Sequence, residues 1–195
     1  MVRCYITDRT ALPAPNAGSV AALLAQIAAV GHAGIELIQL REKDLDGRAL
    51  YQLAVAARER LASSPGQLLI NDRLDIALAA GAAGVHLPAA GLPVAEVRRH
   101  APAGFIITQS CHSPAEVAAA ARAGADWCVL APIFSTPSKP GVAPLGVEAI
   151  RAAAGQGRVL ALGGISAETI SRCLEAGAAG IAGIRYFQST HPAKP

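Results

Sequence analysis

The sequence predicts an α/β protein of the (β/α)8 barrel class, and a recurring pattern is the first reason. An alanine-rich, helix-like stretch stops at a glycine and leads into an apolar run at Gly31, Gly81, Gly124 and Gly177, about every 50 residues. Glycine adopts the left-handed conformation at little cost, so it commonly marks the joint between a helix and the next strand. Each interval is about twice as long as one strand-plus-helix unit, so it should hold a second unit.

Eight apolar segments of strand length are the second reason. Parallel strands buried on both faces read as continuous apolar runs rather than alternating ones. The predicted strands are residues 3–7, 35–40, 67–71, 84–87, 104–110, 126–131, 158–162 and 180–184. An open doubly wound sheet is the alternative, and it would require two or three of these strands to be absent.

Segments with helical periodicity separate the strands, among them residues 20–30, 47–61, 114–123 and 167–176. Ser113 before Pro114 is typical of a helix start, with a capping serine and proline at the first helical position, and Ser166 is similar. No Pro/Ser-rich linker divides the chain. We therefore expect one barrel domain over residues 1–187 and a frayed tail over residues 188–195, which lack periodicity.

Composition narrows the class of protein. Hydrophobic residues make up 52% and the net charge is +3, which is incompatible with a disordered chain. There is no run of Lys and Arg, so we expect no nucleic-acid partner. The most apolar stretch, residues 20–30, is too short to span a bilayer, and we expect no secretory signal, because the first residues lack a basic segment followed by an apolar one. The four cysteines include no Cys-x-x-Cys pair, which argues against zinc and redox sites. These features predict a soluble, cytoplasmic protein without a membrane partner.

Unusual polar residues follow the predicted strands, where barrel enzymes place their chemistry. Gln39, Arg41 and Lys43 alternate after the second strand, so an extended chain would point an amide and two cations to one side, which suits a phosphate or diphosphate. Salt bridges to Glu36, Glu42 or Asp44 are the structural alternative. Asn71 and Asp72 end the third strand. Asp72 could bind Mg²⁺ together with substrate phosphate oxygens, although either residue could instead cap the next helix.

The later strands deliver a second group of candidates. Residues 135–141 form a loop rich in hydroxyls, with Thr136, Ser138 and Lys139, that could close over an anion or be an ordinary surface loop. Gly164 precedes a predicted helix start, and with Gly183 after the eighth strand it matches the phosphate site common in barrels. His112 follows Ser110 and Cys111 and could move a proton or be structural, whereas His86 inside an apolar strand is interpreted as packing. Asp8, Arg9 and Asp75 could be capping or ion-pair residues and are given no role in the chemistry.

Two anion sites, one cationic and one lined by glycine, imply two phosphorylated groups. The residues by themselves therefore predict group transfer or isomerisation on small phosphorylated molecules.

Several motifs, in order and spacing, resemble the thiamine phosphate synthase and thiazole tautomerase superfamily over nearly the whole chain. They are Tyr5-Ile-Thr-Asp8, Gln39-Leu-Arg-Glu-Lys43, Leu69-Ile-Asn-Asp-Arg73, Gly84-Val-His-Leu87, Ser110-Cys-His-Ser113, Pro132-Ile-Phe-Ser-Thr-Pro-Ser-Lys139 and Leu162-Gly-Gly-Ile165. The resemblance implies a (β/α)8 barrel that joins 4-amino-5-hydroxymethyl-2-methylpyrimidine diphosphate to a thiazole phosphate and releases diphosphate.

The resemblance also implies roles for single residues. Ser110 would lie beside the pyrimidine, and Asp72 would bind Mg²⁺. Thr136 and Ser138 would contact the thiazole substrate, with Gly164 and Gly183 near its phosphate. The pyrimidine substrate and its diphosphate would be held by Gln39, Arg41, Lys43, Asn71 and Lys139.

Two positions depart from the synthase pattern. Gly91 stands where synthases carry an aspartate that is a second magnesium ligand, and Arg185 stands where they carry a serine in the phosphate loop. Arginine could still bind the phosphate, but the loss at Gly91 weakens the expected magnesium site. The alternatives are a metal-independent thiazole tautomerase with His112 as its acid/base, and a non-catalytic ligand-binding barrel. A homodimer remains open.

Overall fold

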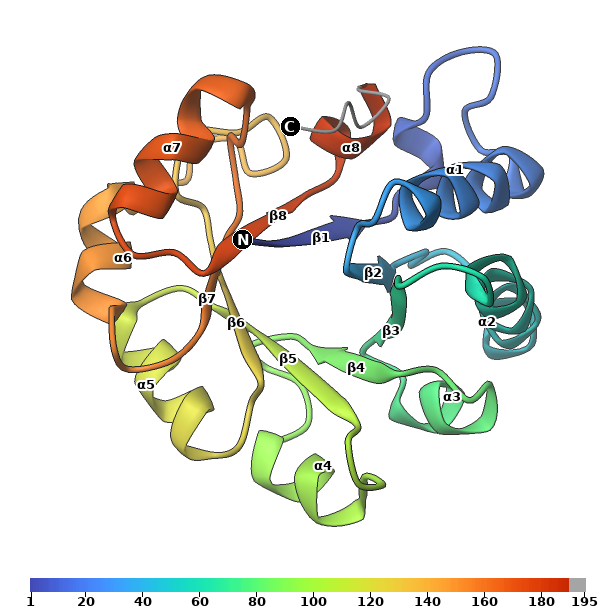
Figure 1. Ribbon diagram of the computed structural model, residues 1–195, viewed down its shortest axis with the longest axis horizontal. Coiled ribbons are helices and arrows are strands. Elements are labelled where there is room, and N and C mark those ends of the chain that lie inside the picture. Colours follow the sequence, from blue (N-terminus) through green and yellow to red (C-terminus); the bar gives the residue numbers. More distant parts are fainter. Residues whose placement is uncertain (190–195) are drawn as a thin grey trace. The chain divides into compact units, whose positions relative to one another are not determined.

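The computed structural model describes residues 1–189, in which eight strands form a closed barrel in the order of the chain (Figure 1). The strands are β1 Val2–Ile6, β2 Leu37–Leu40, β3 Gln67–Asn71, β4 Gly84–Leu87, β5 Ile106–Cys111, β6 Trp127–Leu130, β7 Val159–Ala161 and β8 Gly180–Gly183. Every predicted strand is present, with ends shifted by about one or two residues, as is usual for element boundaries. The predicted (β/α)8 barrel is confirmed and the open doubly wound sheet is wrong.

Helices alternate with these strands. They are a short 3₁₀ turn η1 Arg9–Ala11, then α1 Val20–His32, α2 Gly47–Leu61, α3 Leu74–Ala79, α4 Val94–His100, α5 Pro114–Arg122, α6 Gly146–Ala153, α7 Ala167–Glu175 and α8 Arg185–Ser189. The predicted helix starts are confirmed. Ser113 Oγ accepts the N–H of Glu116 at 3.2 Å, and the N–H of Ser166 donates to the Thr169 hydroxyl at 2.8 Å.

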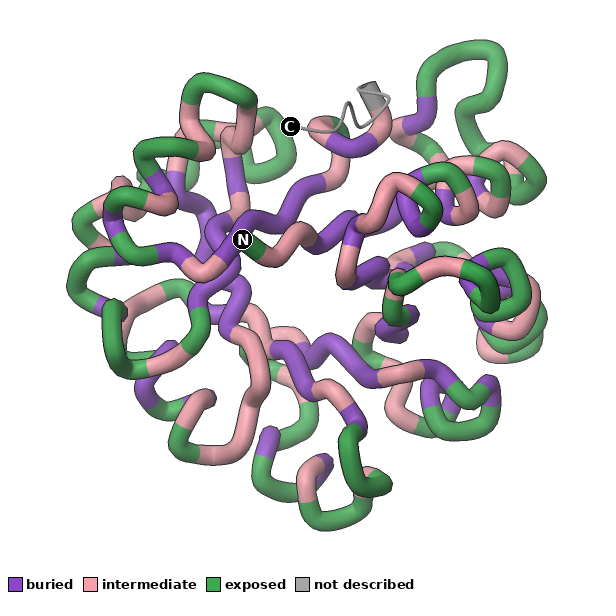
Figure 2. Tube along the Cα trace, in the orientation of Figure 1, coloured by how far each residue is buried: buried purple, intermediate pink, exposed green. Residues whose placement is uncertain are grey.

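The chain divides into two compact units. We call residues 4–85 together with residues 184–189 the N-terminal unit, and residues 1–3 with 86–183 the C-terminal unit. In the N-terminal unit, β2 pairs in parallel with β1 and β3, with Gln39 opposite Ile6 and Leu69. Helix α1 packs against α2, and α2 and α3 pack against β3 (Figure 1). All four residues of β2 are buried (Figure 2).

The C-terminal unit has its apolar core between strands β5 to β7 and helices α5 to α7. Strands β5 to β8 pair in parallel, with Cys111 opposite Leu130 and Leu130 opposite Ala161. These three residues pack in one buried cluster with Val117 of α5 and Ile150 of α6. Because side chains alternate along a strand, Ser110, which precedes Cys111 on β5, faces the side of the sheet away from this cluster. Figure 2 shows the strands of this unit buried along most of their length.

Helix α8 changes the expected boundary of the tail. Gln188 was expected to begin it, but it lies within α8, and its amide donates to the backbone oxygen of Asp8 at 2.8 Å and to the Tyr5 hydroxyl at 3.3 Å. The remainder of the predicted tail, residues 190–195, lies outside the described residues.

Cys4, Cys111, Cys128 and Cys173 are all buried and unpaired by disulfides, as expected for thiols that act as small apolar groups. Within residues 1–189, no helix combines the length and the apolarity that a membrane span requires.

Candidate active site

The first candidate group follows β2 and contains two cations without carboxylate partners among the described residues. Arg9 pairs with Glu42 and Asp44, two of the three carboxylates that are the alternative partners of Arg41 and Lys43, and no ion pair within residues 1–189 joins the third, Glu36, to either cation. The Arg41 side chain is half-buried and that of Lys43 is exposed. The salt-bridged interpretation of these cations is therefore wrong within the described part of the chain, and their charges are available to an anion.

Arg9 and Thr7 hold the loop that carries these cations. The Thr7 hydroxyl donates to Glu42 Oε1 at 2.6 Å and accepts the backbone N–H of Arg41 at 2.9 Å. A guanidinium nitrogen of Arg9 donates to Glu42 Oε2 at 2.9 Å. Glu42 is 4% exposed, so this carboxylate is buried and its charge is compensated by Arg9. The same guanidinium holds the pKa of Asp44 below its usual range.

The alternation that suggested a shared side for Gln39, Arg41 and Lys43 does not extend along the whole segment. Strand β2 ends at Leu40. Lys43 lies in a turn in which the Leu45 N–H donates to the backbone oxygen of Glu42 at 3.4 Å. The hydrogen bonds of Thr7 and Arg9, rather than a strand, therefore fix this loop.

Gln39 is buried and its amide lacks a partner. Its side chain is 1% exposed, and its Nε2 makes no hydrogen bond with the described residues. A buried, unsatisfied amide costs free energy, so its presence calls for an explanation such as a ligand. Gln39 is consistent with a donor that is reserved for a substrate atom.

Asn71 and Asp72 stand at the end of β3, next to the end of β2, because Leu40 is opposite Ile70. Asp72 has φ of +61°, the only positive φ among the non-glycine residues described. Residues kept in this conformation commonly occur at functional sites. Helix α3 begins at Leu74 after Arg73, without a side-chain cap, so neither Asn71 nor Asp72 caps it.

Asp72 fits a magnesium ion that is shared with a substrate better than one held by protein alone. Within residues 1–189, no three His, Cys, Asp or Glu side chains form a metal-binding group. Mg²⁺ commonly keeps several waters and binds through one or two carboxylates together with substrate phosphates. The exposed carboxylate of Asp72 satisfies the protein's share of that arrangement.

The second candidate group belongs to the C-terminal unit and begins with the loop after β6. Thr136 is half-buried, whereas Ser138 and Lys139 are exposed. The loop bends back on itself, because the N–H of Lys139 donates to the Thr136 oxygen at 3.1 Å and that of Ser138 to the Thr136 hydroxyl at 3.4 Å. The Lys139 ammonium has no ion-pair partner in the described chain, so its charge is available to an anion.

The glycine pair after β7 packs directly beneath that loop. The N–H of Phe134 donates to the Gly163 oxygen at 3.0 Å. Gly164 has φ of +64°, and a Cβ at this position would lie 2.6 Å from Phe134 Cβ and 2.7 Å from the Ser135 oxygen. Only glycine fits both the conformation and this contact. The Thr169 hydroxyl in the first turn of α7 donates to the Gly164 oxygen at 3.2 Å, so the loop is joined to the helix start.

Ser110 and His112 occupy the end of β5. His112 is exposed, and its Nδ1 lies 2.8 Å from the Ala131 oxygen. Because a carbonyl only accepts, Nδ1 carries the proton in this contact, and Nε2 of a neutral ring then carries the lone pair. The interpretation of His86 as an apolar packing residue is incomplete. Its Nδ1 lies 2.7 Å from the Thr108 hydroxyl and its Nε2 2.9 Å from that of Ser110.

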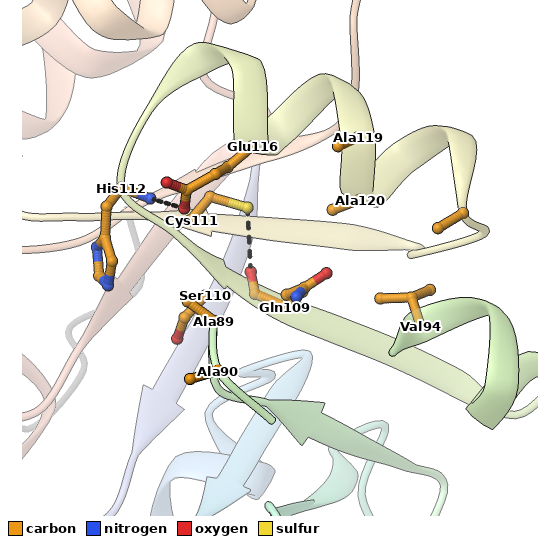
Figure 3. A pocket seen from close by; sticks show the side chains of 11 residues that line it. Ala89, Ala90, Val94, Gln109, Ser110, Cys111, His112, Glu116, Ala119 and Ala120 are labelled. Carbon is orange, nitrogen blue, oxygen red and sulfur yellow. Dashed lines mark hydrogen bonds between the residues drawn. The ribbon is translucent and has the colours of Figure 1, made fainter. Parts of the chain in front are cut away.

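A cavity of about 430 Å³ adjoins this strand end (Figure 3). Five of its eleven lining residues are alanines, and Figure 3 shows the Gln109 side chain pointing into it between Val94 and Ala120. Ser110, His112 and Glu116 provide polar groups at the strand end, where Glu116 accepts the backbone N–H of His112 at 2.8 Å. Its volume lies within the range of pockets for small molecules.

The last two candidates end the barrel. Gly183 is the buried last residue of β8, and Arg185 begins α8 with an exposed side chain. Arg185 has an interaction with the rest of the chain, so it is not a free cation.

Each unit thus gathers part of the predicted site. The N-terminal unit holds Gln39, Arg41, Lys43, Asn71 and Asp72 on the adjacent ends of β2 and β3. The C-terminal unit joins the loop of Thr136 to Lys139 with the Gly163-Gly164 turn, and places Ser110 and His112 at the end of β5. The expected ion pairing of Arg9 is confirmed, but the sequence did not show that it supports the cationic loop, nor that His86 bonds to Ser110, because both roles depend on partners far along the chain.

Cations without carboxylate partners among residues 1–189 and a glycine turn at a helix start are features typical of barrel enzymes that act on phosphorylated small molecules. Residues 5–187 match the family model described as "Thiamine monophosphate synthase". The chain therefore belongs to the thiamine monophosphate synthase family.

Named relatives agree with this family. The chain is 46% identical over 163 residues to a thiamine-phosphate synthase of Methanoculleus marisnigri, covering 82% of this chain and 76% of that protein. It is 40% identical over 184 residues to one of Chlorobium luteolum, covering 93% and 82% respectively. Among solved structures, the thiamine phosphate pyrophosphorylase of Pyrococcus furiosus superposes with a TM-score of 0.79 at 27% identity, covering 96% of this chain and 92% of that one.

Proposed function

We infer that this protein is a thiamine-phosphate synthase, a transferase that joins a pyrimidine diphosphate to a thiazole phosphate. The 46% identity to a relative of that name over 82% of the chain is the observation that supports it most strongly. In the reaction, the bond between the pyrimidine methylene carbon and the diphosphate oxygen breaks, and diphosphate leaves with the electron pair. The thiazole nitrogen then forms a bond to the methylene carbon of the resulting pyrimidinylmethyl cation.

The N-terminal unit supplies the groups proposed for the pyrimidine diphosphate. Arg41 and Lys43, which have no carboxylate partners in the described chain, neutralise the diphosphate, and arginine offers a bidentate fork. The unpartnered Nε2 of Gln39 donates to a ring or phosphate atom, and Asn71 at the end of the adjacent strand β3 adds a second amide. The buried position of Gln39 supports the role, because a bound acceptor would remove the cost of its missing hydrogen bond.

The C-terminal unit supplies the groups proposed for the leaving group and the thiazole. Lys139 stabilises the departing diphosphate, and Ser110 contacts the pyrimidine. Thr136 and Ser138 bind the thiazole substrate. Gly164 and Gly183 leave room for its phosphate, which the N–H groups at the start of α7 favour. Arg185 is proposed to take the place of a phosphate-binding serine.

Magnesium is proposed to be held by Asp72 together with oxygens of the diphosphate substrate. When bound, the ion would supply positive charge that offsets the charge of the leaving diphosphate. Gly91 removes one expected carboxylate, so the substrate and water must provide the remaining ligands. We therefore expect magnesium to bind the enzyme with its substrate rather than the enzyme alone.

A thiazole tautomerase is the second candidate, and the geometry of His112 favours it. With Nδ1 held by the Ala131 carbonyl, an exposed Nε2 is available to take a proton from a substrate carbon and to return one elsewhere. This activity would need no metal, which agrees with the glycine at position 91. The non-catalytic interpretation has no comparable support, because the matched relatives are named as synthases.

We propose that the protein's partners are the two small phosphorylated substrates. We expect it to bind neither nucleic acid nor membrane and to act in the cytoplasm. Size-exclusion chromatography with light scattering would test whether a homodimer forms.

The decisive experiment incubates the purified protein with both phosphorylated substrates, with and without magnesium, and measures thiamine phosphate and diphosphate by mass spectrometry. Magnesium-dependent formation of both products supports the synthase. Lys139→Ala should lower turnover by about 10²–10³-fold, as for other charge-stabilising donors, and Lys139→Arg should lower it less. Absence of thiamine phosphate under both conditions would overturn the proposal.

The tautomerase is tested separately with the thiazole carboxylate phosphate in deuterated water without metal. If this reaction is the physiological one, deuterium exchange is fast and His112→Ala abolishes it while coupling persists. Equal loss of both reactions in His112→Ala would contradict a role of His112 that is specific to the tautomerase reaction.

A further inference from the structure

The interior face of the C-terminal unit contains a buried polar relay that the sequence did not reveal. His86 of β4 is 4% exposed and Thr108 of β5 is 1% exposed. Both ring nitrogens of His86 meet hydroxyls of β5, with Nδ1 2.7 Å from Thr108 Oγ1 and Nε2 2.9 Å from Ser110 Oγ. Thr108 and Ser110 are two residues apart on one strand, so they share a face and can contact one ring.

We propose that His86 is a positioning residue, which fixes the Ser110 hydroxyl for the pyrimidine substrate. This inference rests on the proposed synthase function, in which Ser110 contacts that substrate. A serine hydroxyl otherwise rotates freely about its Cβ–Oγ bond. A hydrogen bond to Nε2 occupies one of its directions, so that the others are presented to a ligand.

The second contact makes His86 a rigid support. A ring bonded through one nitrogen could rotate, whereas contacts at both nitrogens define its plane. Burial strengthens the arrangement, because a displaced imidazole would leave buried polar atoms without partners. In a neutral ring, one nitrogen donates and the other accepts, so the proton position at Ser110 is linked to that at Thr108.

The position of Ser110 makes such control useful. Side chains alternate along β5, so Ser110 points to the side of the strand opposite to Gln109, whose side chain enters the cavity (Figure 3). On that side Ser110 is half-buried, whereas His86 is 4% and Thr108 1% exposed. The Ser110 hydroxyl is therefore the part of the relay that a bound molecule can reach. His86 and Thr108 are more deeply buried, so their proposed effect on the substrate passes through Ser110.

Two amide variants separate the two contacts of the ring. In His86→Gln the amide can reach the place of Nε2 and bond Ser110, whereas in His86→Asn it can reach only the place of Nδ1 and bond Thr108. The variants are made with and without Ser110→Ala, and kcat, KM and thermal melting are measured on the full chain. We expect His86→Asn to lower kcat/KM by about tenfold, the equivalent of one net hydrogen bond, and His86→Gln to restore most of it.

The double variants decide whether His86 acts through Ser110. In the Ser110→Ala background, His86→Asn should cause no further loss, because the contact is already absent. Additive losses, or equal losses in the Asn and Gln variants at unchanged melting temperature, would overturn the inference. If the His86 variants do not fold, Thr108→Val loosens the ring from its other side and enters the same cycle.

The same cycle is carried out on the calorimetric affinity for the pyrimidine diphosphate alone, which requires no turnover. Coupling between positions 86 and 110 in this affinity supports the relay, and its absence contradicts it, even if the wild-type protein forms no thiamine phosphate. A wild-type protein that binds the diphosphate with this coupling but lacks synthase activity would refute the proposed function while sustaining the positioning role.

Discussion

The Thr7 hydroxyl donates to the Glu42 carboxylate across 2.6 Å and so joins the residue after β1 to the loop after β2. Arg9 bonds the other carboxylate oxygen at 2.9 Å. The Glu42 side chain is 2% exposed and that of Arg9 12% exposed, so both groups are largely removed from water. Arg9 thus occupies the Glu42 and Asp44 carboxylates, and Arg41 and Lys43 have no carboxylate partner within residues 1–189.

We predict that Glu42→Gln destabilises the protein and loosens the cationic loop. In Glu42→Gln the arginine keeps only its exposed partner Asp44 and the buried charged hydrogen bonds of Glu42 are lost, which should cost about 1–3 kcal/mol. Urea denaturation should show this loss, and the KM for the pyrimidine diphosphate should rise. The matched control is Asp44→Asn, which removes the exposed partner of the same arginine and should have a much smaller effect. Equal losses in the two variants would refute the role assigned to burial.

At position 72, charge and backbone conformation can be separated. Asparagine tolerates the positive φ of Asp72 but lacks its charge, whereas alanine lacks the charge and also disfavours the positive φ. We expect Asp72→Asn to unfold like the wild type and Asp72→Ala to lose about 1 kcal/mol of unfolding free energy. Both should lose the magnesium dependence of thiamine phosphate formation. An Asp72→Asn variant with the wild-type magnesium response would rule out the proposed ligand.

Gly164 and Gly155 form a matched pair for the glycine turn. Both have positive φ, but only a Cβ at Gly164 would meet backbone atoms, whereas that at Gly155 would point into open space. Gly155→Ala should cost about 1–2 kcal/mol for the conformation alone. Gly164→Ala should lose clearly more unfolding free energy and raise the KM for the thiazole phosphate, because the loop at Phe134 and Ser135 must move to make room for the methyl group. Similar melting temperatures for the two variants would contradict the packing argument.

Burial of Cys4 predicts a loss of stability at high pH. Burial raises the pKa of this thiol to about 12 from an ordinary value of 9.0. The folded state therefore keeps the proton while the unfolded state releases it, so this contribution is complete below pH 9 and declines as the pH rises toward 12. The melting temperature should fall across that range, and it should fall less steeply in Cys4→Ala. Identical slopes would show that another group controls the transition. Burial also raises the pKa of Tyr5, which should leave a residual slope.

The sequence by itself determined the order of the barrel elements and the residues at the strand ends. The glycines at residues 31, 81, 124 and 177 and the continuous apolar runs are local signals, because turn conformation and burial depend on neighbouring residues. Local signals located every strand to within about two residues, together with the helix starts at Ser113 and Ser166.

Only the tertiary structure decided which polar groups are paired. Glu42 could pair with Arg9, which is 33 residues away, or with its neighbour Arg41. The periodicity of the sequence carries no information about which of the two arginines it pairs with. The bonds of His86 to Thr108 and Ser110 likewise connect different strands. Such pairings depend on strand register and on side-chain reach in three dimensions, so they emerge only once the barrel has assembled.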